Sequence, residues 1–367
     1  MRYLIITIVL IFFFISCSRD SEDSWHIIHG FPTPIELQGE HILENEFGVL
    51  LIISAHSYII TSTIRDTIFH VYNKNYEYLG GFGQQGQGPY EFREVGLINQ
   101  LIEHDNRVIV FAIDYMIRKI YGFDLLSTLN SDELVVLYDY ELPWELAGAN
   151  INYQVDEDTI IGTYHDHFYQ RLDGKYGLFY YYPATDSIEI FPLYNLDIYS
   201  NGGHTVTDPF PRININAHAS AISPDRSKFA IQLVYTPRLE ITTIGDPQPS
   251  RFLLKSKPPK EDFVLESIQQ YTAPQYYIYI QATDNYIYLL YSGHSEADDE
   301  VQQLEKIVQV IDWNGKPHRQ FLIPAQYDIT LFTVDEENGY FYGLSHTTDK
   351  IYRFDFGSIV SEFSLNN

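Results

Sequence analysis

The stretch GGFGQQGQGPYEF, residues 80–92, decides between two folds for this chain. Its glycines spell G-x-G-x-x-G from position 81, a pattern that cradles a dinucleotide when it follows a strand and opens a helix. Here Gly88 and Pro89 follow the last glycine of the pattern and occupy the place of the first helical turn. Both residue types interrupt helices at such positions. The stretch therefore predicts a turn between β-strands and not a nucleotide site.

The rest of the chain also reads as β-structure. It contains 31 Tyr and 23 Phe, and aromatic and β-branched residues favour the pleated surface of strands. Short apolar segments alternate with turns that are rich in Asn, Asp and Gly. They form six groups, at about residues 55–92, 93–145, 150–196, 214–245, 272–324 and 328–357. Six units of four-strand size predict an all-β, six-bladed β-propeller, with a pair of β-sandwiches as the alternative.

Two stretches resemble the TolB-like six-bladed propeller lipoproteins of Bacteroidetes. The first matches the G-x-G-P-x-E-F signature of that family with Gly86, Gly88, Pro89, Glu91 and Phe92. The second, VQVIDWNGKPHRQFLIP followed by ITLFTVDEENGYFYGLS, is similar to the end of the family's propeller. The resemblance implies the propeller fold and a place in the cell envelope. It implies no activity, because the family has no agreed one.

The same five residues have structural roles in a blade corner. The glycines permit positive φ angles and close approach of the backbone. We expect Pro89 to set the exit of the turn, Glu91 to accept hydrogen bonds from backbone amides, and Phe92 to fill the space between neighbouring blades.

The first 17 residues predict where the protein resides. Arg2 precedes an apolar run over residues 3–15, and Cys17 stands at the cleavage position. This run would form about 20 Å of helix, short of the ~30 Å hydrocarbon core, so residues 1–16 are predicted to be a signal peptide. FISC resembles a lipobox, and we expect lipid on Cys17 to anchor the protein in the outer membrane, at the cell surface or on the periplasmic face. An ordinary secretory leader is the alternative.

Residues 17–24 are expected to form a flexible tether, followed by a single propeller over residues 25–367. The acidic run SRDSEDS within the tether is either a signal for export to the cell surface or a plain linker. Propellers often join their two chain ends. We therefore expect residues 25–37 to complete the last blade by pairing beside residues 340–356.

The charge balance narrows the class of partner. The chain has 23 Lys and Arg against 49 Asp and Glu, a formal net charge of −26. A phosphate backbone requires a basic surface, so nucleic acid is not expected as a partner. Membrane contact is expected only through the lipid anchor.

Histidines supply the candidate chemistry. In TYHDHF, His165 and His167 share one face of a strand and predict two ligands of a divalent metal such as zinc; solvated histidines at a strand end are the alternative. The loop GGHTVTDPFPR places His204, Asp208 and Arg212 where a binding mouth is expected. His218 is expected on an inner strand near the axis. These six residues are the candidate ligand- or partner-binding set.

No sequence motif indicates a catalytic nucleophile or a zinc protease, since G-x-S-x-G and H-E-x-x-H are both missing. We therefore expect a binding or scaffold module for a protein or glycan partner, without a cofactor and without catalysis. The alternative is a metal-assisted hydrolase or lyase with a site in the propeller funnel. A purely structural subunit of an envelope complex is a third interpretation.

Overall fold

The computed structural model describes residues 25–358 apart from positions 45, 56, 89–90, 105–106, 132, 147–148, 166–175, 193–216, 247, 255–271, 296 and 299–302. The predicted signal peptide and tether, with Cys17, lie outside these residues. So do several predicted site residues: Pro89, His167, His204, Asp208 and Arg212.

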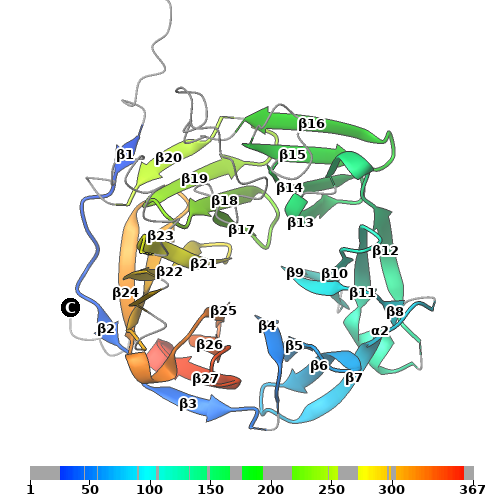
Figure 1. The fold of residues 1–367 in the computed structure, drawn as a ribbon, viewed down its shortest axis with the longest axis horizontal. Coiled ribbons are helices and arrows are strands. Elements are labelled where there is room, and N and C mark those ends of the chain that lie inside the picture. Colours follow the sequence, from blue (N-terminus) through cyan, green and yellow to red (C-terminus); the bar gives the residue numbers. More distant parts are fainter. Residues whose placement is uncertain are drawn as a thin grey trace, which may run out of the picture.

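Six sheets stand like blades around a central channel (Figure 1). The first strand of each blade is the innermost one. These innermost strands are β4 (Val49–Ser54), β9 (Val95–His104), β13 (Ala149–Asp156), β17 (His218–Ile222), β21 (Gln275–Ala282) and β25 (Leu331–Asp335). We number the blades 1 to 6 in this order. The arrangement confirms the predicted six-bladed propeller.

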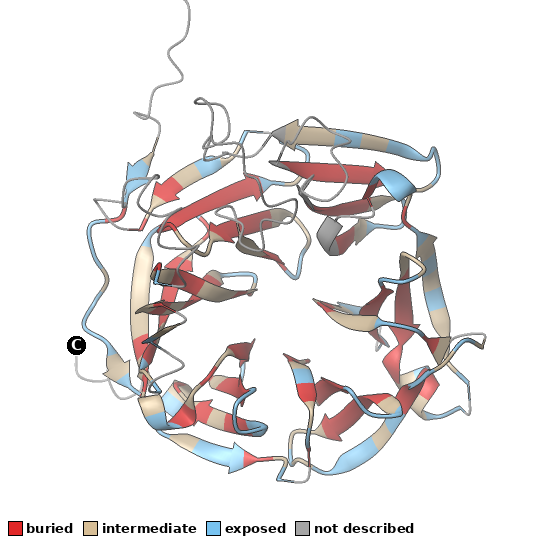
Figure 2. Cartoon of the chain, in the orientation of Figure 1, coloured by how far each residue is buried: buried red, intermediate tan, exposed pale blue. Residues whose placement is uncertain are grey.

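The middle two strands of each blade are the most deeply buried (Figure 2). They are β5 (Tyr58–Thr63) and β6 (Thr67–Asn73), β10 (Arg107–Asp114) and β11 (Lys119–Asp124), β14 (Thr159–His165) and β15 (Tyr176–Tyr182), β18 (Lys228–Leu233) and β19 (Arg238–Thr243), β22 (Tyr286–His294) and β23 (Lys306–Asp312), and β26 (Tyr340–Ser345) and β27 (Lys350–Asp355). In β10, seven residues in a row are buried. Both faces of a blade pack against neighbouring blades, so these strands read as continuous apolar runs and not as alternating ones.

The fourth strand of each blade lies toward the outside of the ring (Figure 1). These strands are β7 (Tyr78–Gln85), β12 (Val136–Glu141), β16 (Ser187–Pro192), β20 (Ser250–Leu253), β24 (Pro317–Ile323) and β3 (Gly39–Ile42). Short elements complete the fold: β8 (Glu91–Phe92), helix α2 (Leu125–Leu129) and the 3-10 turns η2 (Trp144–Leu146) and η3 (Ala325–Tyr327). No helix among the described residues is long and apolar enough to cross a bilayer.

The N-terminal part of the chain closes the ring, but the residues that pair with the last blade are not the predicted ones. Strand β3 pairs antiparallel with β27 and completes blade 6. Residues 25–37 do not pair beside residues 340–356: β1 (His26–Ile27) adds in parallel to β20, and β2 (Ile35–Glu36) adds in parallel to β24. The prediction was wrong because Gly30, Pro32 and Pro34 interrupt the segment and leave room only for two-residue pairings. The uninterrupted GEHI sequence that follows forms the closing strand instead.

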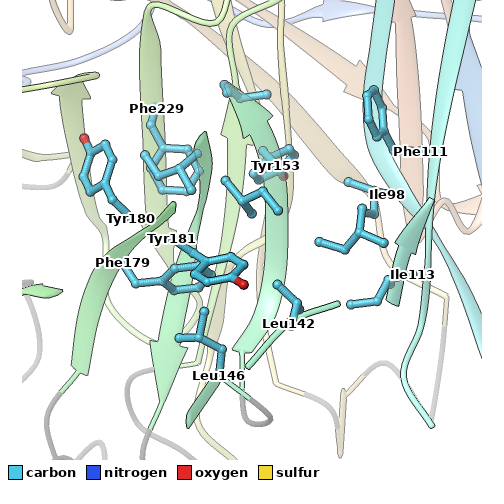
Figure 3. Packing of buried hydrophobic residues seen from close by; sticks show 14 of the residues in the cluster. Ile98, Phe111, Ile113, Leu142, Leu146, Tyr153, Phe179, Tyr180, Tyr181 and Phe229 are labelled. Carbon is cyan, nitrogen blue, oxygen red and sulfur yellow. The ribbon is translucent and has the colours of Figure 1, made fainter. Parts of the chain in front are cut away.

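Apolar side chains between the blades hold the ring together. The cluster that joins blades 2, 3 and 4 contains Phe111 of blade 2, Tyr153 and Phe179 of blade 3, and Phe229 of blade 4 (Figure 3). Tyr153 and Phe229 meet edge to face, with ring centroids 5.7 Å apart. Burial of each such ring contributes about 1.5–3 kcal/mol, and aromatic pairing adds to it.

Candidate functional site

The direction of the innermost strands defines two ends of the channel. Every blade begins with its innermost strand, so the six innermost strands run the same way along the axis (Figure 1). Their last residues meet at one end, here called the carboxyl end. Their first residues meet at the opposite, amino end.

A cavity of about 460 Å³ opens at the carboxyl end. Its walls come from the ends of innermost strands in blades 1, 2, 4, 5 and 6 and from the turns that follow them. Six carboxylates line it: Glu103, Asp225, Asp284, Asp335, Glu336 and Glu337. We call this cavity the acidic mouth. Among its described lining residues, Arg226 is the single basic one. A cleft lined by one sign of charge concentrates its field and attracts groups of opposite charge.

The acids of blades 4 and 5 are fixed by turn hydrogen bonds. Asp225 Oδ1 accepts from Ser223 Oγ at 2.5 Å and from the Ser227 amide at 3.0 Å. Burial works to raise the pKa of Asp225, but these hydrogen bonds together hold it below its usual value. The Asp225 amide in turn donates to Asp284 Oδ1 at 3.1 Å. The two turns therefore hold the side chains of Asp225 and Asp284 in a fixed arrangement.

A lysine from the rim joins blades 1 and 6 at the mouth. Lys74 Nζ donates to Asp335 Oδ2 at 2.7 Å and to Ser54 Oγ at 2.6 Å. It also lies 5.2 Å from the centroid of the Tyr342 ring. Burial lowers the pKa of Lys74 below its usual value, and the Asp335 carboxylate offsets part of that effect. The contact shows that this part of the rim accommodates an ammonium group.

Polar side chains span the channel at the base of the mouth. Asn99 Nδ2 in β9 donates to Gln281 Oε1 in β21 at 2.6 Å. The neighbouring Gln100 exchanges two hydrogen bonds with the backbone of Gln154 in β13. The base of the cavity is thus built from amides that offer both donors and acceptors to a ligand.

Comparisons with known proteins agree with this architecture. Residues 240–337 match the family described as TolB-like 6-blade propeller-like. The resemblance to the TolB-like propellers is confirmed. No curated protein matches the chain.

Two solved structures are similar to this propeller. One is an exported protein of Bacteroides fragilis, with 13% identity, a TM-score of 0.54, and coverage of 87% of this chain and 94% of that chain. The other is a DUF4221-family protein of Bacteroides vulgatus, with 11% identity, a TM-score of 0.58, and coverage of 88% and 97%. At these identities the likeness concerns the fold alone.

Two of the histidine candidates, His165 and His218, have described backbones, and these lie at the amino end of the propeller, opposite the acidic mouth. His218 begins β17, and its Nε2 lies 2.7 Å from Thr163 Oγ1 in β14. His165 ends β14 two residues further on, so the backbones of both candidates reach the same end of the channel. The side chain of His165 is outside the described part of the structure. The same holds for the whole of four other candidates, His167, His204, Asp208 and Arg212. The grouping of these residues stays a prediction.

The predicted metal site is not represented among the described residues. Within them, no three His, Cys, Asp or Glu side chains are placed to hold a metal ion. The pair His165 and His167 stays a prediction, because neither side chain is described.

The glycine-rich stretch over residues 80–92 contains the end of strand β7 and the short strand β8. Glu91 Oε2 accepts a hydrogen bond from the Gly88 amide at 2.7 Å. A Cβ atom on Gly86 would lie 2.0 Å from the same oxygen, so a larger residue there would displace the Glu91 carboxylate. Phe92 is 1% exposed and meets Phe69 of blade 1 and Phe123 of blade 2, with centroids 5.8 and 6.0 Å away.

Sequence reasoning missed the acidic mouth. Its carboxylates stand in turns that look like ordinary hairpin turns, such as SPDR, TDN and DEEN. One signal was present: the turn after the first strand of several units carries an acidic residue. That recurrence indicates an acidic ring only once the first strand of each unit is known to be innermost.

Proposed function

We propose that the protein is a binding module of the cell envelope that holds a basic segment of a partner protein in its acidic mouth. One observation carries this proposal: six carboxylates and one guanidinium line a cavity of about 460 Å³ at the end of the channel. A lysine or arginine side chain from a partner fits both the charge and the polar base of this cavity.

The location forms part of the proposal. The apolar leader and the lipobox-like FISC sequence support lipid attachment at Cys17 and residence in the outer membrane. The similar structure from Bacteroides fragilis is described as an exported protein, which agrees with an envelope location. The tether would then hold the propeller close to the membrane and leave both ends of the channel accessible.

The hydrogen bonding of Asp225 favours a role in binding over one in proton transfer. A general acid or base works best with a pKa near the operating pH. The hydrogen bonds on Asp225 instead hold its pKa below the usual value, so the group stays charged at neutral pH. A fixed negative charge attracts a cation and does not exchange a proton with it.

Titration of the purified mature chain with a fluorescent lysine-rich peptide tests the proposal. We expect saturable binding that weakens as salt rises from 50 to 300 mM. Replacing Glu103, Glu336 and Glu337 by glutamine should weaken binding at least tenfold.

A control variant changes the net charge by the same amount at the amino end: Asp66→Asn, Glu94→Gln and Glu145→Gln. It should keep the affinity within about twofold. Equal losses in the two variants would show a response to net charge alone and would overturn the mouth as the binding site. A failure to bind the peptide in the unaltered chain would overturn the choice of a basic partner.

A further inference from the structure

A second cavity lies on the outer side of the ring, where blades 4 and 5 meet (Figure 1). Its volume is about 400 Å³, within the range of ~300–1,000 Å³ in which small molecules bind. Its walls come from β1 and the residues that follow it, from β20, and from the turn between β23 and β24. Because β1 belongs to the N-terminal segment that crosses both blades, we call this cavity the strap groove.

Tight packing fixes the walls of the strap groove. A Cβ atom on Gly315 would lie 2.1 Å from the Phe252 ring, so the turn of blade 5 rests directly on the outer strand of blade 4. In the same turn, Trp313 Nε1 donates to the Thr283 carbonyl at 3.0 Å. Strand β1 is held in place by its pairing with β20. A ligand therefore meets walls that are already formed.

The strap groove is opposite in charge to the acidic mouth. None of its described lining residues is Asp or Glu, although the whole chain has 49 of these residues. Lys316 supplies a positive charge, and the other polar side chains that line the groove are His26, His29, Ser250 and Asn314. All five residues are exposed. An anion that enters the groove thus meets hydrogen-bond donors and no carboxylate among these lining residues.

The donors of the strap groove are available to a ligand. Within the described part of the protein, none of its five polar side chains has a hydrogen bond or an ion pair to another residue. The carboxylate of the same turn, Asp312, is already occupied. Its Oδ1 accepts from the backbone amides of Asn314 and Lys316, both at 2.9 Å.

We propose that the strap groove binds a sugar that carries a phosphate or sulfate group. The ammonium of Lys316 and the imidazoles donate to an oxyanion, and Ser250 and Asn314 match sugar hydroxyls. Phe252 and Trp313, which are largely buried, offer apolar surface to the C–H groups of a sugar ring. The groove is too large for a bare phosphate ion to fill. Both the ligand and the site are distinct from those of the acidic mouth.

Calorimetric titration of the mature chain at pH 7 tests the proposal with four probes: glucose 6-phosphate, glucose 6-sulfate, inorganic phosphate and glucose. We expect at least one of the two esters to bind one-to-one, and to bind about tenfold or more tightly than inorganic phosphate or glucose. Failure of both esters to bind would overturn the proposal. Equal binding of inorganic phosphate would overturn the assignment of a sugar.

Matched variants locate the ligand. Lys316→Met should weaken ester binding about tenfold, and Asn314→Ala about fivefold, through the loss of one charged and one neutral hydrogen bond. Both positions are exposed, so neither change should unfold the chain. Lys350→Met removes the same charge at an exposed position of blade 6 and should keep the affinity within about twofold.

The triple glutamine variant of the acidic mouth should bind the ester at least as well as the unaltered chain does. Weaker binding in that variant would place the ester in the mouth and would overturn the strap groove as its site. Equal losses in Lys316→Met and Lys350→Met would show a response to net charge alone and would overturn it as well.

Discussion

The side-chain amides of Asn99 and Gln281 meet across the central channel, with Nδ2 and Oε1 2.6 Å apart. They come from β9 of blade 2 and β21 of blade 5, which stand opposite one another in the ring (Figure 1). The two residues are 182 positions apart in the sequence, so the contact joins distant parts of the chain. It forms the base of the acidic mouth and ties the ring together through its centre.

A double-mutant cycle should detect this contact. We expect Asn99→Ala and Gln281→Ala each to lower the free energy of unfolding by about 1 kcal/mol, since each removes a partly buried hydrogen bond. The double variant should lose less than the sum, with a coupling of about 0.5–1 kcal/mol. Urea unfolding monitored by tyrosine fluorescence measures all three values. Strict additivity would show that the two amides do not interact in solution.

Phe92 should be a major contributor to the seam between blades 1 and 2. It is 1% exposed and contacts rings from both blades, so Phe92→Ala should lower the free energy of unfolding by about 3–5 kcal/mol. Phe47→Ala removes the same side chain at a position that is 57% exposed and should cost less than about 1 kcal/mol. Denaturant unfolding of the two variants measures both losses. Similar losses of unfolding free energy in Phe92→Ala and Phe47→Ala would contradict the packing described for Phe92.

Gly83 is required by both its backbone angle and its surroundings. Its φ is +72°, and an added Cβ would lie 2.9 Å from the Phe69 ring. Gly83→Ala should therefore lower the free energy of unfolding by about 2–4 kcal/mol, through left-handed backbone strain and overpacking. Gly245 has a φ of +89° with nothing within 4 Å of the added atom, so Gly245→Ala should cost only about 1 kcal/mol. Equal thermal shifts in the two variants would show that the Phe69 contact is unimportant.

Buried tyrosines should make the protein sensitive to alkali. Burial raises the pKa of Tyr140 to about 12, although a hydrogen bond from Gln154 partly offsets the rise. An unfolded tyrosine loses its proton near pH 10, so the folded state binds more protons between pH 10 and 12. The stability that Tyr140 contributes is therefore complete below pH 10 and is lost as the pH rises to 12.

The variant Tyr140→Phe isolates this contribution. At pH 8 it should be less stable than the unaltered chain by about 1 kcal/mol, because the hydroxyl donates to the Glu157 carbonyl at 2.9 Å. The difference should shrink as the pH rises above 10. Urea unfolding at pH 8, 10 and 11 provides the comparison, and a difference that does not change with pH would exclude a titration of Tyr140 as its source.

Local sequence patterns were sufficient for the elements and the fold class. The apolar run of β10, the turn residues between strands and the glycine-rich corner each act on near neighbours in the chain, so they can be read without knowing the rest of the fold. The number of blades followed from counting such units. The predicted bounds of the second, third and fifth units agree with the observed blades to within a few residues, whereas the first unit omits β4 and the fourth omits β20.

Ring closure and the acidic mouth could be decided only by the tertiary structure. Residues 25–37 contain strand-like segments, but sequence does not tell which of six similar edges a two-residue strand will choose. In the mouth, Ser54 and Asp335 come together through Lys74 although Ser54 belongs to the first blade and Asp335 to the last blade of the sequence. Such contacts arise because the ring brings the ends of its innermost strands to one place, and this geometry is a property of the closed assembly of blades. The sequence alone determined the strands, turns and blade count, whereas closure of the ring determined which carboxylates share a cavity.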